Sequence, residues 1–181
     1  MATEPLASVF LVGPMGSGKT AVGKRLARCL GYGFVDSDAV IEERTGVDIP
    51  FIFEKEGEAG FRMREREVID ELTRRPGIVL ATGGGAVLAA QNRANLAQRG
   101  MVVYLETSVE QQLARTRRSR KRPLLETDDP RSRLEQLMAV REPLYREIAA
   151  ITVRTDGRKV GAVAEEIAGQ LRGPESGTEK S

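Results

Sequence analysis

Apolar residues along this chain follow two alternating patterns, short continuous runs and longer stretches with helical spacing. The short runs are rich in valine, leucine and isoleucine, which is typical of strands buried on both faces of a parallel sheet. They predict five strands, at residues 8–13, 32–36, 77–85, 101–107 and 150–155. The stretches between them predict helices at 18–30, 38–44, 58–75, 90–99, 109–116, 131–150 and 160–171, the sixth of them interrupted near Pro143.

Strands that alternate with helices predict an α/β fold with a parallel sheet covered on both faces. Ligands of such sheets bind beyond the carboxyl ends of the strands. A glycine-rich loop, Asp36 and a glycine triplet at 83–85 each follow a predicted strand, so we expect them to meet in one cleft. No repeat or second domain boundary is visible. We expect one domain over residues 1–172 and a polar, disordered tail over 173–181.

Composition narrows the class of protein. The 181 residues are 40% hydrophobic and 30% charged, with a net charge of +2, so no broad basic field for nucleic acid is expected. No apolar run approaches the roughly 20 residues of a membrane span, and the N-terminus lacks a secretory pattern. Cys29 is the single cysteine, which favours a reducing, cytoplasmic location. From the apolar runs and the net charge we expect neither a membrane nor a nucleic acid as partner.

The sequence contains no histidine. Histidine-based triads, histidine general bases and histidine metal sites are therefore excluded. Acid–base chemistry would have to use aspartate, glutamate, lysine or tyrosine.

The segment "GPMGSGKT", residues 13–20, fits the phosphate-loop pattern G-x-x-x-x-G-K-[ST]. Its glycines let backbone N–H groups turn toward phosphate oxygens, while Lys19 reaches the β- and γ-phosphates and Thr20 ligates Mg²⁺. The alternative is a plain glycine turn with a solvated lysine. A strand before and a helix after the loop favour a nucleoside triphosphate with Mg²⁺. The γ-phosphoryl group could pass to water or to a hydroxyl, and the small size of the chain favours a small-molecule kinase.

Two carboxylates follow the second predicted strand. Asp36 or Asp38 can hold Mg²⁺, directly or through water, and the other can accept a hydrogen bond or a proton from an attacking hydroxyl. The competing interpretation is that Asp38 is only the N-cap of the next helix. Both roles are compatible.

Glycines and arginines supply further candidates. Gly83, Gly84 and Gly85 bring bare backbone close to a ligand, unless they form only a tight turn. The basic run from Arg115 to Arg122 is a solvated face, a nucleic-acid patch or a lid over the triphosphate; few aromatic residues argue against the patch, and the phosphate loop favours the lid. Arg141 and Arg146 both suit a substrate carboxylate, and composition does not choose between them.

Six segments stand together in the order "GPMGSGKT", "DSD", "EGEAGFRMRE", "TGGGAV", "KRPLL" and "REPLYREIA". With them the chain resembles the shikimate kinase family over about residues 9–171. The phosphate loop alone is generic, but the combination is specific. The resemblance implies a P-loop NTPase fold of the nucleoside-monophosphate-kinase type, with three α/β/α layers and a five-stranded parallel sheet. It also implies a mobile lid at about 117–130, a shikimate-binding segment at about 38–61, and a monomer.

The resemblance also implies roles for individual residues. ATP would phosphorylate the 3-hydroxyl of shikimate, with Asp38, Lys19 and Arg122 as catalytic residues. Shikimate would be bound by Asp38, Arg62, Gly83, Gly84, Gly85 and Arg141. Thr20 and Asp36 would lie at Mg²⁺. The nucleotide would contact Gly16, Ser17, Gly18, Lys19, Thr20, Ala21, Arg115, Arg122 and Arg158.

Two rival functions stay open on the sequence. One is a small-molecule kinase with another acceptor, such as a gluconate kinase, against which the triple glycine and "REPLYR" argue. The other is a nucleotide-dependent binding or regulatory protein without catalysis. Against it, the candidate catalytic residues Lys19, Thr20, Asp36 and Asp38 are all present.

Overall fold

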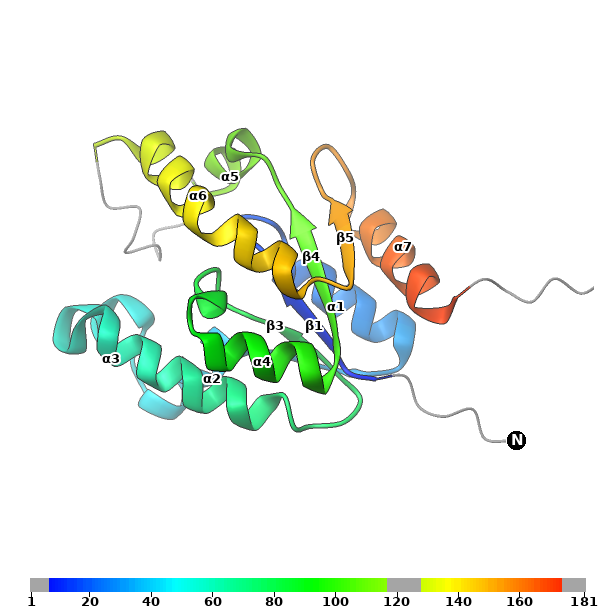
Figure 1. Ribbon diagram of the computed structural model, residues 1–181, viewed down its shortest axis with the longest axis horizontal. Coiled ribbons are helices and arrows are strands. Elements are labelled where there is room, and N and C mark those ends of the chain that lie inside the picture. The colour runs from blue at the N-terminus through cyan, green and yellow to red at the C-terminus, as the bar shows by residue number, and fades with distance from the viewer. Residues whose placement is uncertain (1–6, 117–127, 174–181) are drawn as a thin grey trace, which may run out of the picture.

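The computed structural model describes residues 7–116 and 128–173 (Figure 1). Within these ranges the five predicted strands are confirmed. The elements in chain order are β1 Val9–Val12, α1 Lys19–Leu30, β2 Gly33–Asp36, α2 Ser37–Thr45, α3 Ile49–Leu72, β3 Ile78–Ala81, the 3₁₀ turn η1 Ala86–Leu88, α4 Ala90–Arg99, β4 Met101–Glu106, α5 Val109–Thr116, α6 Pro130–Ile148, β5 Ile151–Arg154 and α7 Val160–Arg172.

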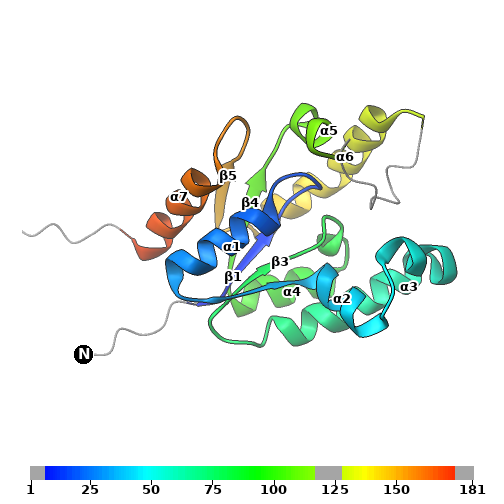
Figure 2. The same ribbon diagram turned by 180° about the vertical axis from the view of Figure 1, so that it is seen from behind.

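All five strands run parallel in one sheet with the order β2-β3-β1-β4-β5. The first strand in the chain is therefore the central one. Helices α1 and α7 cover one face, which is nearer the viewer in Figure 2, and α4 and α6 cover the other, seen in Figure 1. The predicted three-layer α/β/α arrangement is confirmed.

The core follows from the side-chain alternation of buried parallel strands. Val9 and Leu11 of β1 pack with residues of α1 and α7, whereas Phe10 and Val12 pack with residues of α3, α4 and α6. All four side chains are fully buried. Burying an apolar side chain of this size contributes roughly 1.5–3 kcal/mol. The continuous apolar run at the N-terminus is thus explained by two helical layers, one on each face.

Helix α3 begins earlier than the sequence predicted. The prediction began at residue 58, but a first helical stretch starts at Ile49, capped by the Asp48 carboxylate, which accepts from the N–H of Phe51 at 3.0 Å. The two stretches meet at Gly57, whose φ of 72° and ψ of 179° form a kink. Such a conformation is essentially restricted to glycine. The prediction therefore missed the helical stretch from Ile49 to the kink at Gly57.

The predicted interruption near Pro143 is wrong, because α6 continues through this proline. Proline removes one intrahelical hydrogen bond and usually kinks or ends a helix. Here Leu134 and Arg141 before the proline and Tyr145 after it are all buried against the protein. Tertiary packing on both sides of Pro143 holds the helix together.

Several expectations concern residues outside the described ranges. The predicted lid lies at positions 117–127 outside them, and its last part, from Pro130, is the start of α6. Gly173 is the C-cap of α7, and the rest of the predicted tail, 174–181, lies outside the described residues. In the part of the chain that the structure describes, no helix is long and apolar enough to cross a membrane.

Candidate active site

The phosphate loop joins the carboxyl end of β1 to α1. Gly16 and Gly18 have φ of 75° and 89°, in the left-handed region that favours glycine. Gly18 is also the N-cap of α1 and makes no side-chain cap. The first N–H groups of α1 therefore have no capping side chain across them, which is the arrangement that binds phosphate. Arg115 of α5 braces the loop, because its Nη1 donates to the Gly16 carbonyl at 2.7 Å.

Lys19 folds back over this loop. Its Nζ donates to the carbonyl oxygens of Gly13 at 2.6 Å and Pro14 at 2.8 Å, and lies 3.4 Å from Oγ of the buried Ser17. The ammonium is thereby held above the curled backbone. A phosphate bound in the loop would meet this positive charge.

Asp36 connects the phosphate loop to α2. Its Oδ2 accepts from the Thr20 hydroxyl at 2.9 Å, and its Oδ1 accepts from the N–H groups of Asp38 at 2.9 Å and Ala39 at 3.2 Å. The N-cap of α2 is therefore Asp36, and the interpretation of Asp38 as the cap is wrong. The cap fixes Asp36 beside Thr20, so the two predicted Mg²⁺ ligands are adjacent.

Thr20 and Asp36 suit a Mg²⁺ that is bound together with a nucleotide, and do not form a complete metal site by themselves. Among the described residues, no group of three or more His, Cys, Asp or Glu could hold a metal ion. Mg²⁺ bound with a nucleotide takes one or two protein ligands and completes its shell with phosphate oxygens and water. A hydroxyl and a carboxylate are a suitable donor set for that mode.

One cavity of about 330 Å³ joins the donor loop to the predicted acceptor residues. Asp38 lies inside it, and a Cβ built on Gly83 would be only 2.9 Å from Oδ1 of Asp38. The cavity is lined by Met15, Gly16, Gly18, Lys19, Thr20, Ala21, Asp36, Asp38, Thr82, Gly83, Gly84 and Arg115. Residues from the ends of β1, β2 and β3 thus meet as the strand pattern predicted.

The glycine triplet passes between two arginines. A Cβ built on Gly85 would lie 2.3 Å from Nη2 of Arg62, and one on Gly84 would lie 3.4 Å from Nη1 of Arg141. The two guanidinium groups therefore occupy or adjoin the space that side chains at positions 84 and 85 would fill. This favours the ligand-binding interpretation of the triplet over a plain turn, since a turn alone would not place two cations beside it.

Glu65 belongs to this cluster and was not predicted. Arg62 Nη1 donates to Glu65 Oε1 at 2.9 Å, and the Glu65 side chain is 1% exposed. Burial raises the pKa of Glu65, while Arg62 and then Arg141 oppose that rise; burial lowers the pKa of Arg141. The half-exposed Glu58 also pairs with Arg62, at 3.4 Å, whereas Arg141 forms no ion pair within the described residues, so Arg141 is the guanidinium group best placed for an incoming anion. The spacing of Arg62 and Glu65, three apart on a helix, was the available signal.

Tyr145 was also missed. Its hydroxyl donates to the Gly84 carbonyl at 2.5 Å, and its ring stacks on Tyr104 with centroids 5.1 Å apart. Tyr145 follows Arg141 by four positions in α6, so both side chains lie on the same helix face. The spacing of four between Arg141 and Tyr145 was the signal in the sequence.

The structure distinguishes between the arginines that the sequence left open. Arg141 is buried beside the glycine triplet, whereas the half-exposed Arg146 pairs with Glu142 of α6 and Glu106 of β4, away from the triplet. Arg158 does not line the cavity; its guanidinium pairs with Glu166 and donates to the Arg154 carbonyl. Arg122 lies outside the described residues.

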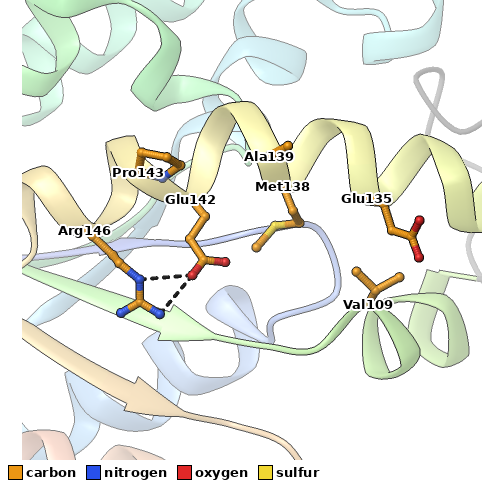
Figure 3. A pocket seen from close by; sticks show the side chains of 7 residues that line it. All are labelled: Val109, Glu135, Met138, Ala139, Glu142, Pro143 and Arg146. Carbon is orange, nitrogen blue, oxygen red and sulfur yellow. Dashed lines mark hydrogen bonds and ion pairs between the residues drawn. The ribbon is translucent and has the colours of Figure 1, made fainter.

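A second, larger hollow of about 590 Å³ lies along α6 (Figure 3). Its lining includes Val109, Met138, Glu142 and Arg146, and Figure 3 shows Arg146 hydrogen-bonded to Glu142. The phosphate loop, Asp38 and Arg141 do not line it. This hollow is the larger of the two and has carboxylates of its own, Glu135 and Glu142, but it lacks the phosphate-binding backbone, so the smaller cavity is the candidate active site.

Comparisons with known proteins agree with this geometry. A family model described as shikimate kinase matches residues 15–172. A shikimate kinase of Vibrio cholerae is 59% identical over 164 residues, which are 91% of this chain and 94% of the relative. A solved shikimate kinase from Acinetobacter baumannii, in complex with shikimate, is 54% identical and superposes with a TM-score of 0.89, covering 91% of this chain and 92% of that one.

A gluconokinase from Sinorhizobium meliloti also superposes, with a TM-score of 0.61 at 20% identity over 94% of each chain. That likeness shows the fold alone. The family model and the high identity over nearly the whole length show more. This chain belongs to the shikimate kinase family.

Proposed function

We propose that this chain transfers the γ-phosphoryl group of ATP to the 3-hydroxyl of shikimate, giving ADP and shikimate 3-phosphate. The observation that carries the proposal is one cavity that joins the phosphate loop to Asp38, Gly83 and Gly84, with Arg141 beside Gly84 and Arg62 beside the adjoining Gly85. A kinase needs its two substrates in one water-poor space with the reacting atoms in line. The V. cholerae and A. baumannii relatives support the same acceptor.

The acceptor would be held at its carboxylate. Arg62 and Arg141 present guanidinium groups, which bind carboxylates through paired, charge-assisted hydrogen bonds. Arg62 pairs with the buried Glu65 and with the half-exposed Glu58, whereas Arg141 forms no ion pair in the part of the chain that the structure describes. A shikimate carboxylate would pair with Arg141 and share Arg62, with Gly83, Gly84 and Gly85 offering backbone beside it.

The acceptor ring would extend from the arginines toward Asp38. There the carboxylate would orient the 3-hydroxyl and accept its proton as the new oxygen–phosphorus bond forms. The bond between the γ-phosphorus and the bridging oxygen breaks in the same step, and ADP keeps that electron pair. Asp38 suits this role because Asp36, and not Asp38, is used to cap α2.

The donor side would neutralise phosphate charge. Lys19 and the backbone of Gly16, Ser17 and Gly18 would bind the phosphates, with Ala21 and Arg115 beside them. Mg²⁺, held by Thr20 and Asp36, would neutralise negative charge on the β- and γ-phosphates when bound. The roles of Arg122 at the moving phosphoryl group and of Arg158 at the adenine stay predictions, as do the mobile lid, the monomeric state and the cytoplasmic location.

The test is ADP release from the purified chain with ATP and Mg²⁺, with and without shikimate. We expect release that depends on shikimate, with a phosphate monoester of shikimate as the product by ³¹P NMR. Gluconate is the matched control acceptor, since it also carries a carboxylate and several hydroxyls. ADP release stimulated by gluconate and not by shikimate would overturn the acceptor, and ATP binding without any stimulated release would favour the binding-protein alternative.

A further inference from the structure

We infer that Tyr145 is a positioning residue for the acceptor, because it fixes the peptide between Gly84 and Gly85 against the two carboxylate-binding arginines. The inference rests on the proposed function. It assigns to a tyrosine of α6 a part in acceptor affinity that neither its burial nor its helix position would require.

The hydrogen bonding of the glycine triplet is the first observation. Within this turn, the Gly83 carbonyl accepts from the N–H of Ala86 and the Gly85 carbonyl from the N–H of Leu88, each at 3.1 Å. Both bonds are local and would form in any turn of this shape. The Gly84 carbonyl instead accepts from the Tyr145 hydroxyl at 2.5 Å, across 61 positions of sequence. Tyr145 therefore supplies the long-range contact that orients the middle carbonyl of the turn.

A fixed carbonyl also fixes the next N–H. The peptide between Gly84 and Gly85 is trans and planar, so its carbonyl and its N–H point in opposite directions. The Tyr145 hydroxyl holds the carbonyl toward α6, and the N–H of Gly85 then points away from α6. Glycine lacks the steric restraint that would otherwise hold such a peptide in one orientation. The hydrogen bond from Tyr145 thus supplies the restraint on this peptide that a Cβ would otherwise give.

The neighbours of this peptide are the acceptor-binding groups. Gly84 lies against Arg141 Nη1 and the backbone N of Met15, and Gly85 lies against the Arg62 guanidinium. A rotated peptide would therefore disturb both arginines and would alter the approach of the triplet to the phosphate loop. Arg141 also lies close enough to Tyr145 that its charge opposes the rise which burial causes in the pKa of the tyrosine.

The stacked partner of Tyr145 allows the hydroxyl to be tested separately from the ring. Tyr104 of β4 is as fully buried as Tyr145 and stacks on it at an interplanar angle of 26°. Within the described residues, however, the Tyr104 hydroxyl has no hydrogen-bond partner. The two rings share one environment and differ in what their hydroxyls do. Tyr104 is therefore a matched control inside the same chain.

The experiment compares Tyr145→Phe with Tyr104→Phe. Both changes remove one buried hydroxyl and keep the ring, and thermal melting checks that each variant folds. For Tyr145→Phe we expect the KM for shikimate to rise about tenfold, as for loss of a hydrogen bond to a buried carbonyl, while kcat and the KM for ATP change less than about threefold. For Tyr104→Phe we expect all three constants to stay within about twofold, since no bond is lost.

A neutral acceptor separates positioning from general loosening of the fold. In an analogue of shikimate that carries a hydroxymethyl group in place of the carboxylate, the arginine contacts lose most of their strength. We expect Tyr145→Phe to raise the KM for this analogue much less than the KM for shikimate. Equal rises for both acceptors, or an equal rise in the KM for ATP, would overturn the positioning role.

The outcomes also distinguish this inference from the proposed function. A wild-type chain that ignores shikimate would overturn the proposed function, and this inference with it. A shikimate-dependent wild type with a Tyr145→Phe variant no different from Tyr104→Phe would overturn the inference alone.

Discussion

The donor and acceptor halves of the candidate active site are built in different ways. The phosphate-binding backbone and Lys19 of the donor half belong to one continuous segment, Gly13–Ala21, and the bonds that Lys19 makes within it span no more than six positions. Asp36 and Arg115 join this segment from β2 and α5. The acceptor half draws Asp38, Arg62, the triplet 83–85 and Arg141 from four separate elements or turns. Its groups are held by contacts between charged and polar side chains in a buried setting. A local motif carries the first half, and tertiary structure carries the second.

This difference predicts that single substitutions affect the two substrates separately. The largest effect is expected at Asp38, where the halves meet. Asp38→Asn keeps the size of the side chain and removes its charge, so kcat should fall about 10²- to 10⁴-fold, the usual range for a lost general base. ATP affinity, measured by titration calorimetry, should stay unchanged.

The control for this variant is Asp48→Asn. Asp48 caps α3, and asparagine caps a helix about as well as aspartate, so its kinetics should equal those of the wild type. Retained turnover in Asp38→Asn would remove Asp38 from the chemistry and would leave the donor half as the sole source of catalysis.

A second pair of variants tests whether each half binds its own substrate. Arg141→Ala removes one of the two guanidinium groups beside the triplet and should raise the KM for shikimate about 30-fold or more. Arg115→Ala removes the brace on the Gly16 carbonyl and should weaken ATP instead. Steady-state kinetics with each substrate varied in turn will show the contrast.

Equal losses for both substrates in both variants would mean that the halves do not act separately. Arg141→Lys, which keeps the charge, checks that the loss in Arg141→Ala is not misfolding.

A smaller effect is expected from one methyl group at Gly85. Its Cβ would fall 2.3 Å from the end of the flexible Arg62 side chain, which can move without unfolding the chain. Gly85→Ala should therefore keep its melting temperature and raise the KM for shikimate roughly tenfold. In the control, Gly169→Ala, nothing lies within 4 Å of the new Cβ. That helix substitution should stabilise the fold by roughly 0.5–1 kcal/mol without changing kinetics. A Gly85→Ala variant with normal shikimate binding would show that binding does not depend on the present position of the Arg62 guanidinium.

The smallest expected effect is a pH dependence of stability from Glu65. Burial raises its pKa above the ordinary 4.5, so the folded chain binds this proton more tightly than the unfolded chain. The resulting stability is fully present below pH 4.5 and is lost as the pH rises through the folded pKa. Glu65→Gln does not titrate. Its free energy of unfolding, relative to wild type, should therefore rise as the pH increases above 4.5, as measured by urea denaturation. A constant or falling difference would contradict the prediction.

The same contrast explains what the sequence could predict. The sheet, its helices and the donor loop follow from local patterns, since apolar runs and glycine spacing encode them within a few residues. Asp38, Arg62 and Arg141 were assigned through resemblance to a family, and composition alone did not separate Arg141 from Arg146. Glu65 has a local partner, Arg62, three positions away on the same helix, but its burial and the nearby charge of Arg141 come only from the fold. Tyr145 contacts Gly84 across 61 positions, so that contact was visible only in three dimensions.

The predicted helices contain two errors. The predicted helix started at residue 58, just after Gly57, and Pro143 was given its ordinary local meaning, as a break in a helical pattern. At Gly57 the break is real, but helix lies on both sides of it. At Pro143 the buried residues of α6 outweigh the lost hydrogen bond. The local rule for proline failed because tertiary contacts decided the outcome, whereas the stretch before Gly57 has a local cap at Asp48 that the prediction overlooked.

The central place of β1 in the sheet has a consequence for synthesis of the chain on the ribosome. β1 is made first, but its two neighbours, β3 and β4, end only at Ala81 and Glu106. Until then its four apolar residues and their backbone have no sheet partner, a state that favours aggregation of a nascent chain. The phosphate loop at the end of β1 therefore gains both neighbouring strands of the sheet only after more than half of the chain has been translated. The part of the candidate active site that is encoded first depends on strands that are encoded much later.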